Sequence, residues 1–136
     1  MFLYIDTTLG HDIEIIIKKK DKIIACKKIT AAYKQAEKLL PMIEKLLKQN
    51  KLTLKNLSKI LVKNTGGSFT SLRIGVIIAN ALGYSLRIPV KGINSTGEKF
   101  SKLTKKNNKF NLVKPIYTKA PNITVKKKAI ITKIVD

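Results

Sequence analysis

The sequence predicts an α/β domain with a mixed five-stranded sheet and flanking helices. A short apolar run at residues 2–6 and two apolar, β-branched runs at 12–18 and 22–28 come first, and segments with helical periodicity alternate with strands after them. The chain has 136 residues and 44% hydrophobic content, which is enough for one core and argues against disorder. The predicted order is β-β-β-α-β-α-β-α, an antiparallel meander followed by parallel crossovers.

The meander and the first helix occupy the first half of the chain. Residues 2–6 predict a buried strand, and residues 12–18 and 22–28 predict a hairpin that turns at Lys19-Lys20-Asp21. Apolar residues then recur at helical spacing between residues 31 and 49. Pro41 either kinks this helix or opens its first regular turn.

The second half alternates helices and strands. We expect a short helix at 54–58 capped by Thr53, a strand at 59–63, a helix at 71–86, a strand at 89–93 and a last helix at 96–105. Right-handed crossovers place the later strands beside the first one, which gives the mixed sheet of the ribonuclease H-like and actin-like ATPase lobe. We expect residues 1–105 to form this lobe. Residues 106–136 are expected to be a remnant of a second lobe or a C-terminal extension of the same compact domain.

The composition bears on partners and on location. The net charge is +20, carried almost entirely by lysine, and a compositional bias, a nucleic-acid surface or both account for it. Cys26 is the single cysteine, which excludes a disulfide framework. No apolar run is expected to reach the ~18 residues of a membrane helix, and the first residues lack the order of a signal peptide. We therefore expect a cytoplasmic protein that does not enter a membrane.

A glycine loop, NTGGSFTSLRIGV, joins the 59–63 strand to the 71–86 helix. A P-loop would need a lysine before its hydroxyl residue, and a nucleophile elbow would need G-x-S-x-G; neither pattern is present. The expected role is a tight turn followed by a helix cap. The residues of this motif loop are Gly66, Gly67, Ser68, Phe69 and Thr70.

Asp6, Thr7 and Thr8 end the first predicted strand. In actin-like ATPases an acidic residue at this place holds the magnesium nucleotide, and hydroxyls of the following hairpin face the phosphates. The chain has only eight acidic residues, so we expect a degenerate contact without ATP hydrolysis. His11 is the one histidine and is expected to be a turn residue, and no metal site is predicted.

The 71–86 helix carries a stripe of small residues at Gly75, Ala79 and Gly83, while most of its remaining surface is apolar. A helix that is apolar on nearly all sides is buried on more than one side. One interpretation is an interface with another subunit, which the 31–49 helix shares; the other is burial within the domain's own core. The candidate interface residues are Leu39, Leu40, Ile43, Leu47, Arg73, Gly75, Ile78, Ala79, Leu82 and Gly83.

Several of these motifs together resemble the TsaB (YeaZ) family of the bacterial tRNA threonylcarbamoyladenosine machinery. The matching residues are Leu39-Leu40-Pro41, Leu52-Thr53-Leu54, Gly67-Ser68-Phe69-Thr70, Leu72-Arg73-Ile74-Gly75, the opening IDTT and the PIYTKAP segment near the C-terminus. The departures are Asn64-Thr65-Gly66 at the start of the loop, Ser71 in place of a glycine, and Lys119 in place of an arginine. Only about twenty residues stand where the family carries most of its second lobe, so the chain looks like a reduced, one-lobed form.

The resemblance implies a degenerate actin-like ATPase relative that has no catalysis of its own. It implies helix-mediated pairing with the catalytic subunit TsaD, which modifies the adenosine beside the anticodon of ANN-decoding tRNAs. The ATPase TsaE joins that pair, although the shortened second lobe puts its recruitment in doubt, and homodimerisation of the isolated chain is left open. No cofactor is expected in this chain, because ATP and magnesium belong to the partner subunits. The alternatives are a basic tRNA- or RNA-binding module that acts on its own and a minimal nucleotide-binding enzyme that uses Asp6.

Overall fold

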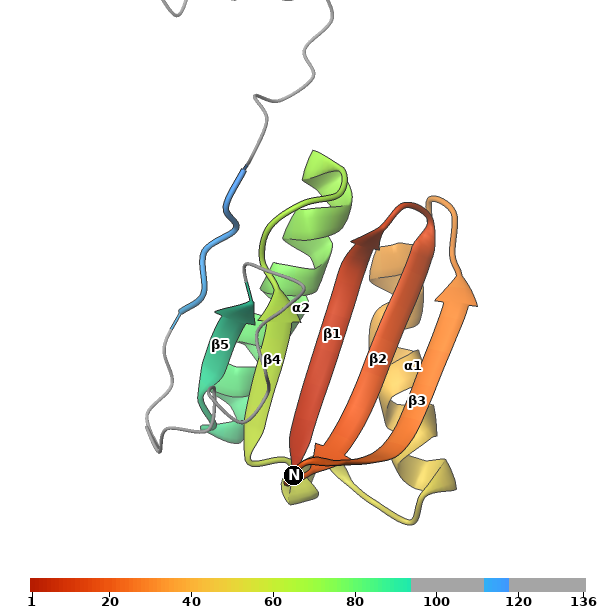
Figure 1. The fold of residues 1–136 in the computed structure, drawn as a ribbon, viewed down its shortest axis with the longest axis vertical. Helices are drawn as coiled ribbons and strands as arrows, with labels where there is room; N and C mark the ends of the chain where they lie inside the picture. Colours follow the sequence, from red (N-terminus) through yellow and green to blue (C-terminus); the bar gives the residue numbers. More distant parts are fainter. Residues whose placement is uncertain (94–111, 118–136) are drawn as a thin grey trace, which may run out of the picture.

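The computed structural model describes residues 1–93 and 112–117. Five strands form one mixed sheet in the order β3-β2-β1-β4-β5 (Figure 1). β1 pairs antiparallel with β2 and parallel with β4, β2 pairs antiparallel with β3, and β4 pairs parallel with β5. The strands are β1 (Phe2–Leu9), β2 (Asp12–Lys19), β3 (Lys22–Thr30), β4 (Lys59–Lys63) and β5 (Val90–Ile93). The predicted meander and parallel crossovers are confirmed.

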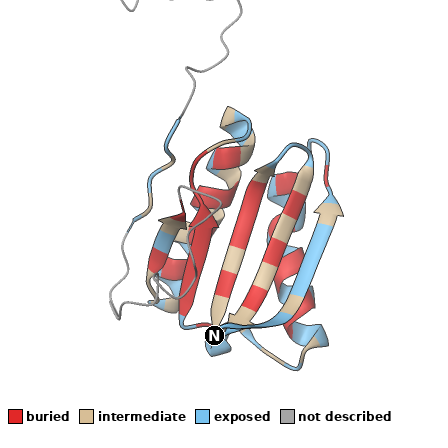
Figure 2. Ribbon diagram, viewed as in Figure 1, coloured by how far each residue is buried: buried red, intermediate tan, exposed pale blue. Residues whose placement is uncertain are grey.

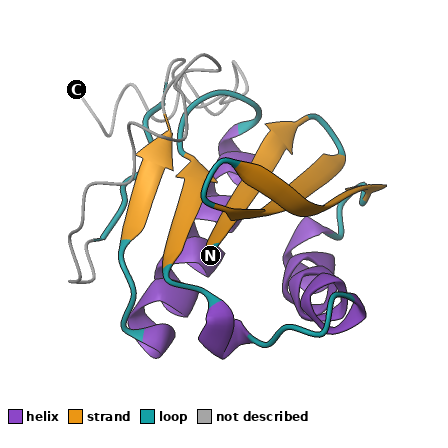
Figure 3. Cartoon of the chain, turned by 60° about the horizontal axis from the view of Figure 1, so that its bottom comes forward, coloured by secondary structure: helices purple, strands orange, loops and turns teal. Residues whose placement is uncertain are grey.

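Two helices, α1 (Gln35–Gln49) and α2 (Phe69–Leu86), cover the same face of the sheet (Figures 1 and 3). The sheet contributes the alternate residues that face the helices, because successive side chains of a strand point to opposite faces. The core residues of the sheet are Leu3, Ile5, Ile13, Ile15, Ile17, Ile60, Val62 and Val90, and the helices add Leu39, Ile43, Leu47, Leu72, Val76 and Ala79. Figure 2 shows the resulting alternation of burial along β1 and β2.

The first helix begins four residues later than expected. β3 runs to Thr30, and the amide of Ala31 donates to the carbonyl of His11, so the chain is still tied to the sheet there. Tyr33 then has a φ of 61°, in the left-handed region that a helix cannot contain. Pro41 lies inside α1 and does not end it.

The other expected boundaries are close to those observed. A 3-10 turn at Leu54–Asn56 takes the place of the expected helix at 54–58, and the Asn56 side chain accepts the Thr53 amide at 2.8 Å. α2 begins two residues earlier than predicted, because Ser68 and not a later hydroxyl caps it. The helix expected at 96–105 and most of the segment 106–136 lie outside the described residues.

Helix α2 has 18 residues, and among the described residues it alone has the length and composition to cross a membrane. The expectation that no apolar run reaches this length was therefore wrong. α2 nevertheless lies against the sheet, with Leu72, Val76 and Ala79 buried. A core helix of a folded domain passes the same test of length and composition.

Candidate functional site

The glycine loop presses against the end of β1. Gly66 and Gly67 have φ values of 89° and 69°, a region that other residues rarely adopt. A Cβ atom on Gly67 would lie 2.7 Å from the Cα of Thr8 and 2.8 Å from its carbonyl oxygen. The conformation of the turn therefore requires both glycines, and its close approach to β1 requires Gly67.

Ser68 caps α2, as the sequence analysis expected of one of the hydroxyl residues in this loop. Its Oγ accepts the Ser71 amide at 3.1 Å, and its carbonyl accepts the Leu72 amide at 3.0 Å. The Ser68 hydroxyl thus satisfies one of the amides that a helix N-terminus leaves unpaired. This is a structural use of the serine that the turn-and-cap interpretation predicted.

Asp6 is buried, and both of its carboxylate oxygens accept hydrogen bonds. Oδ1 accepts from the Thr8 amide at 2.8 Å and the Thr8 hydroxyl at 2.6 Å, and Oδ2 accepts from the Tyr4 hydroxyl at 3.2 Å. Burial, and then the negative charge of Asp6, raise the pKa of Tyr4 above its usual range. The described residues hold no cluster of three or more His, Cys, Asp or Glu that could bind a metal ion.

Thr7 points from β1 toward α2. Its side chain is fully buried, and its hydroxyl donates to the carbonyl of Ser71 at 2.5 Å. Of the three residues proposed as a degenerate nucleotide contact, Thr7 therefore joins the sheet to the helix. The hydrogen bonds of Asp6 go to Tyr4 and Thr8 and stay within β1, whereas that of Thr7 crosses to α2.

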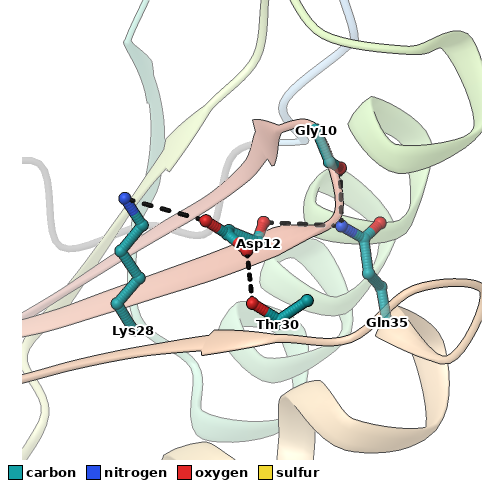
Figure 4. Close-up of polar contacts among 5 residues, drawn as sticks. All are labelled: Gly10, Asp12, Lys28, Thr30 and Gln35. Carbon is teal, nitrogen blue, oxygen red and sulfur yellow. Dashed lines mark hydrogen bonds and ion pairs between the residues drawn. The ribbon is translucent and has the colours of Figure 1, made fainter.

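A cavity of about 460 Å³ lies where the β1–β2 turn meets the first residues of both helices. Its lining residues are Gly10, His11, Tyr33, Gln35, Ser68, Thr70, Ser71 and Ile74. Gln35 is one of these residues, and two hydrogen bonds hold its side chain (Figure 4): its Nε2 donates to the carbonyls of Gly10, at 3.2 Å, and Asp12, at 3.4 Å. His11 packs against Tyr33, with 5.5 Å between their ring centroids, in keeping with the turn role expected of it.

Sequence reasoning missed Gln35 and Tyr33. The helical pattern placed both residues inside a helix, whereas Tyr33 lies in the turn before α1 and Gln35 is the first residue of α1. The extension of β3 to Thr30 and the left-handed Tyr33 bring them beside the glycine loop.

The stripe of small residues lies inside the domain. Ala79 has no exposed surface, Gly75 and Gly83 are buried, and a Cβ on Gly75 would meet the Thr7 hydroxyl. Four further candidate interface residues, Leu39, Ile43, Leu47 and Leu82, are also in the core. The structure thus corrects the proposed location of an interface, because these side chains pack against the sheet and between the helices.

The outer face of α2 is apolar and accessible. We define this outer face by Ile74, Ile77, Ile78, Ala81 and Tyr84, of which Ile77 is 58% exposed and Tyr84 is 74% exposed. Arg73 precedes it on the helix and is exposed, and Leu40 of α1 is 39% exposed. Of the candidates from the sequence, Arg73, Ile78 and Leu40 keep accessible surface, whereas Ile77 and Tyr84 were not among the candidates.

Residues 112–117 bind to the loop and to α2. The Asn80 amide group donates to the Val113 carbonyl at 2.8 Å and accepts the Val113 amide at 2.9 Å. The Ile116 amide donates to the Asn64 carbonyl at 2.6 Å. Tyr117 stacks on Phe69 with 4.4 Å between ring centroids, and the Arg73 guanidinium lies 5.3 Å from the Phe69 ring. The structure therefore brings the SFT and PIY motifs into contact.

Comparisons with known proteins agree with this geometry. A family model described as TsaD, tRNA N6-adenosine threonylcarbamoyltransferase, matches residues 29–117, more than half of the chain. A TsaB protein of Buchnera aphidicola from Schizaphis graminum is 37% identical over 70% of this chain and 44% of its own length. A TsaB protein of Bacillus subtilis is 35% identical over 68% of this chain and 40% of its own.

Solved structures support the fold. YeaZ from Pseudomonas aeruginosa has a TM-score of 0.63 at 22% identity, and the match covers 68% of this chain and 43% of that one. A second structure with the same score is described as an uncharacterized protein with similarity to peptidase YeaZ. The chain spans less than half the length of the relatives it matches.

Proposed function

The chain belongs to the family whose model is described as TsaD, and we propose on this premise that it is a TsaB (YeaZ) protein that acts in threonylcarbamoyladenosine biosynthesis on tRNA. The support is the family match over residues 29–117 and the TsaB names of its curated relatives. Its proposed role is a non-catalytic, cytoplasmic subunit that pairs with the catalytic subunit TsaD. The chain spans less than half the length of those relatives. The proposed role is therefore assigned to this chain alone, and the experiment below tests this chain.

The observation that carries the proposal is the outer face of α2. Ile77 and Tyr84 are exposed, and Ile74, Ile78 and Ala81 extend the same apolar surface along the helix. Helical periodicity places residues 74, 77, 78, 81 and 84 on one side, opposite the stripe that packs on β1. An apolar helix face of this kind fits a helix of a related subunit, and burying Ile77 and Tyr84 supplies the driving force.

The absence of catalysis is part of the proposal. The groups that could act in it already have structural partners: Asp6 accepts three hydrogen bonds, Thr7 donates to Ser71, and Ser68 caps α2. A peptidase would need a base to activate Ser68, and His11 packs instead against Tyr33. We propose that ATP and magnesium are bound by the partner subunits, and that tRNA and TsaE join through the complex.

Co-purification with TsaD tests the proposal. Ile77→Asp places a charge at the centre of the outer face, at a side chain that makes little contact with the core, so the variant should fold normally. We expect it to lose most of the TsaD that the wild-type chain retains on a column. Gln49→Asp, at an exposed position of α1, is the matched control and should retain TsaD.

Equal retention of TsaD by the Ile77→Asp and wild-type chains would show that this face is not the interface. Salt-sensitive binding of tRNA by the isolated chain, with no binding to TsaD, would favour the basic RNA-binding module instead. Circular dichroism of each variant separates a lost contact from a lost fold.

A further inference from the structure

The outer edge of β3 lacks a strand partner among the described residues. β3 is the last strand of the sheet beyond β2, and Figure 2 shows that most of it is exposed. The Ala31 amide donates toward β2, and hydrogen bonding in an antiparallel ladder alternates from residue to residue. The backbone groups of Cys26 and Lys28 therefore point away from β2, toward the free edge.

An apolar groove runs beside this edge. A cavity of about 440 Å³ lies between β3 and α1, with Ile29, Pro41, Met42 and Leu46 among its lining. Met42 and Leu46 are almost fully buried and form its floor, whereas Pro41 is exposed. The groove and the free strand edge lie side by side, which is the arrangement that binds an added strand with alternate side chains in pockets.

Pro41 leaves the carbonyl oxygen of Glu37 without the helical hydrogen bond that an amide at position 41 would donate. Because proline has no amide hydrogen, the carbonyl of Glu37 lacks the donor that residue 41 would supply in a regular helix. Glu37 and Pro41 both line the cavity. A bound segment with a hydrogen-bond donor at this point would pair with the carbonyl oxygen of Glu37, which has no donor from residue 41 of the helix.

Lysines surround the groove and select its occupant. Lys27, Lys38 and Lys45 line it, against the single carboxylate of Glu37. Lys27 pairs with the core residue Ile15 in the ladder, so its side chain points to the helix side of the sheet. A charged residue that points inward on an edge strand discourages pairing with a second copy. The net charge of +20 adds to that repulsion and favours an acidic occupant.

We propose that β3 and this groove bind an extended acidic segment of a partner protein as a sixth strand. The side chains that the segment points toward α1 are every second residue, because successive side chains of a strand point to opposite faces. Some of them are apolar and lie over Met42 and Leu46, and others are carboxylates that meet Lys27, Lys38 and Lys45. The backbone of the segment pairs with the free groups of Cys26 and Lys28. The site lies at the opposite edge of the sheet from β5 and apart from the outer face of α2, so it does not depend on the proposed pairing with TsaD.

The test is binding of a labelled peptide of repeating Val-Ser-Glu-Ser, which places its valines and glutamates on one face of a strand, followed by fluorescence anisotropy with the full chain. We expect binding that weakens with salt. It should fall on the order of tenfold in Lys27→Glu, because that change replaces attraction by repulsion at the groove. Lys48→Glu is the matched control: it changes the charge equally, on an exposed part of α1 that does not line the groove.

Two further probes distinguish strand addition from simple charge attraction. The same peptide with N-methylated amides keeps its charge but loses backbone donors, and it should bind much more weakly. A peptide with lysine in place of each glutamate should not bind. Equal loss of affinity in Lys27→Glu and Lys48→Glu, or undiminished binding of the methylated peptide, would overturn the proposal. A dimer of the chain that excludes the peptide would also overturn the proposal, because the edge of β3 would then bind a second copy of the chain.

Discussion

The Thr7 hydroxyl fills the space that a side chain at Gly75 would need. A Cβ atom built on Gly75 would lie 2.5 Å from Thr7 Oγ1, and that hydroxyl donates to the Ser71 carbonyl one helical turn earlier. The contact fixes the first turns of α2 against the end of β1. The small residue at position 75 is therefore explained by the domain's own packing.

Gly75→Ala is predicted to destabilise the fold. Glycine to alanine inside a helix normally stabilises by up to about 1 kcal/mol, but overlap with a fully buried side chain typically costs about 1–3 kcal/mol. We expect the overlap to dominate, because Thr7 is tied to Ser71 and cannot withdraw freely. Urea unfolding measures the change in the free energy of unfolding.

A second substitution tests the stated cause. Thr7→Ala removes the Oγ1 and Cγ2 atoms that meet the new methyl group, so Gly75→Ala in that background should be neutral or stabilising. Additive effects of the two changes would contradict the contact.

The strands of the sheet could be predicted from the sequence, because the signals for each strand lie within a few consecutive residues. The run ending at Asp6 is apolar, those ending near Lys18 and Lys28 are β-branched, and crossovers between parallel strands have a preferred hand. The small stripe on α2 was ambiguous for a physical reason. A helix that packs on its own sheet and a helix that packs on a partner both need small residues where backbones approach closely, so periodicity could not decide which surface Ala79 faces.

The contacts of the motif loop depend on residues far apart in the chain. Tyr117 reaches Phe69, and Gln35 reaches the carbonyl of Gly10, through the tertiary arrangement alone. The cap by Ser68 was predictable because a hydroxyl at the start of a helix satisfies a neighbouring amide. The exposure of Ile77 was not, because its apolar character indicates burial.

Ser68→Ala is predicted to lower the free energy of unfolding by about 0.5–2 kcal/mol, the usual cost of losing a helix cap. The variant loses the bond from the Ser71 amide. Ser68→Asp keeps an acceptor at the helix N-terminus and should restore most of the stability. Thermal unfolding followed by circular dichroism compares the three chains, and equal stability of all three would show that this cap contributes nothing.

Tyr4 is predicted to make the protein sensitive to alkali. Burial and the nearby Asp6 carboxylate raise the pKa of Tyr4 in the folded state. A raised pKa contributes stability that is fully present below the unfolded value of about 10 and is lost as the pH rises above it. The free energy of unfolding of wild type should therefore fall relative to that of Tyr4→Phe above about pH 10. The two chains differ in no other ionisable group, so a constant difference between them would contradict the prediction.

Asn80→Ala is predicted to release residues 112–117 from α2. The change removes both hydrogen bonds to Val113, whereas Asn80→Asp keeps the acceptor for the Val113 amide and loses the donor to its carbonyl. We expect faster hydrogen exchange at the Val113 amide in Asn80→Ala and an intermediate rate in Asn80→Asp. The Ile116 amide, held by Asn64, should respond less. Unchanged exchange at Val113 would show that other contacts hold the segment.

Ala79→Leu is predicted to lower the free energy of unfolding and Ile77→Leu to leave it nearly unchanged, although both place a leucine on α2. Ala79 has no exposed surface, so a larger side chain would force the helix from the sheet, and overpacking of this kind typically costs about 1–3 kcal/mol. Ile77 is 58% exposed, so leucine at that position keeps the apolar outer face and should leave the free energy of unfolding within about 0.5 kcal/mol of wild type. Urea unfolding of the two variants measures the difference. If Ala79→Leu folded as stably as wild type and lost only its binding to TsaD, the small stripe would face the partner after all, and the assignment of the outer face would be wrong.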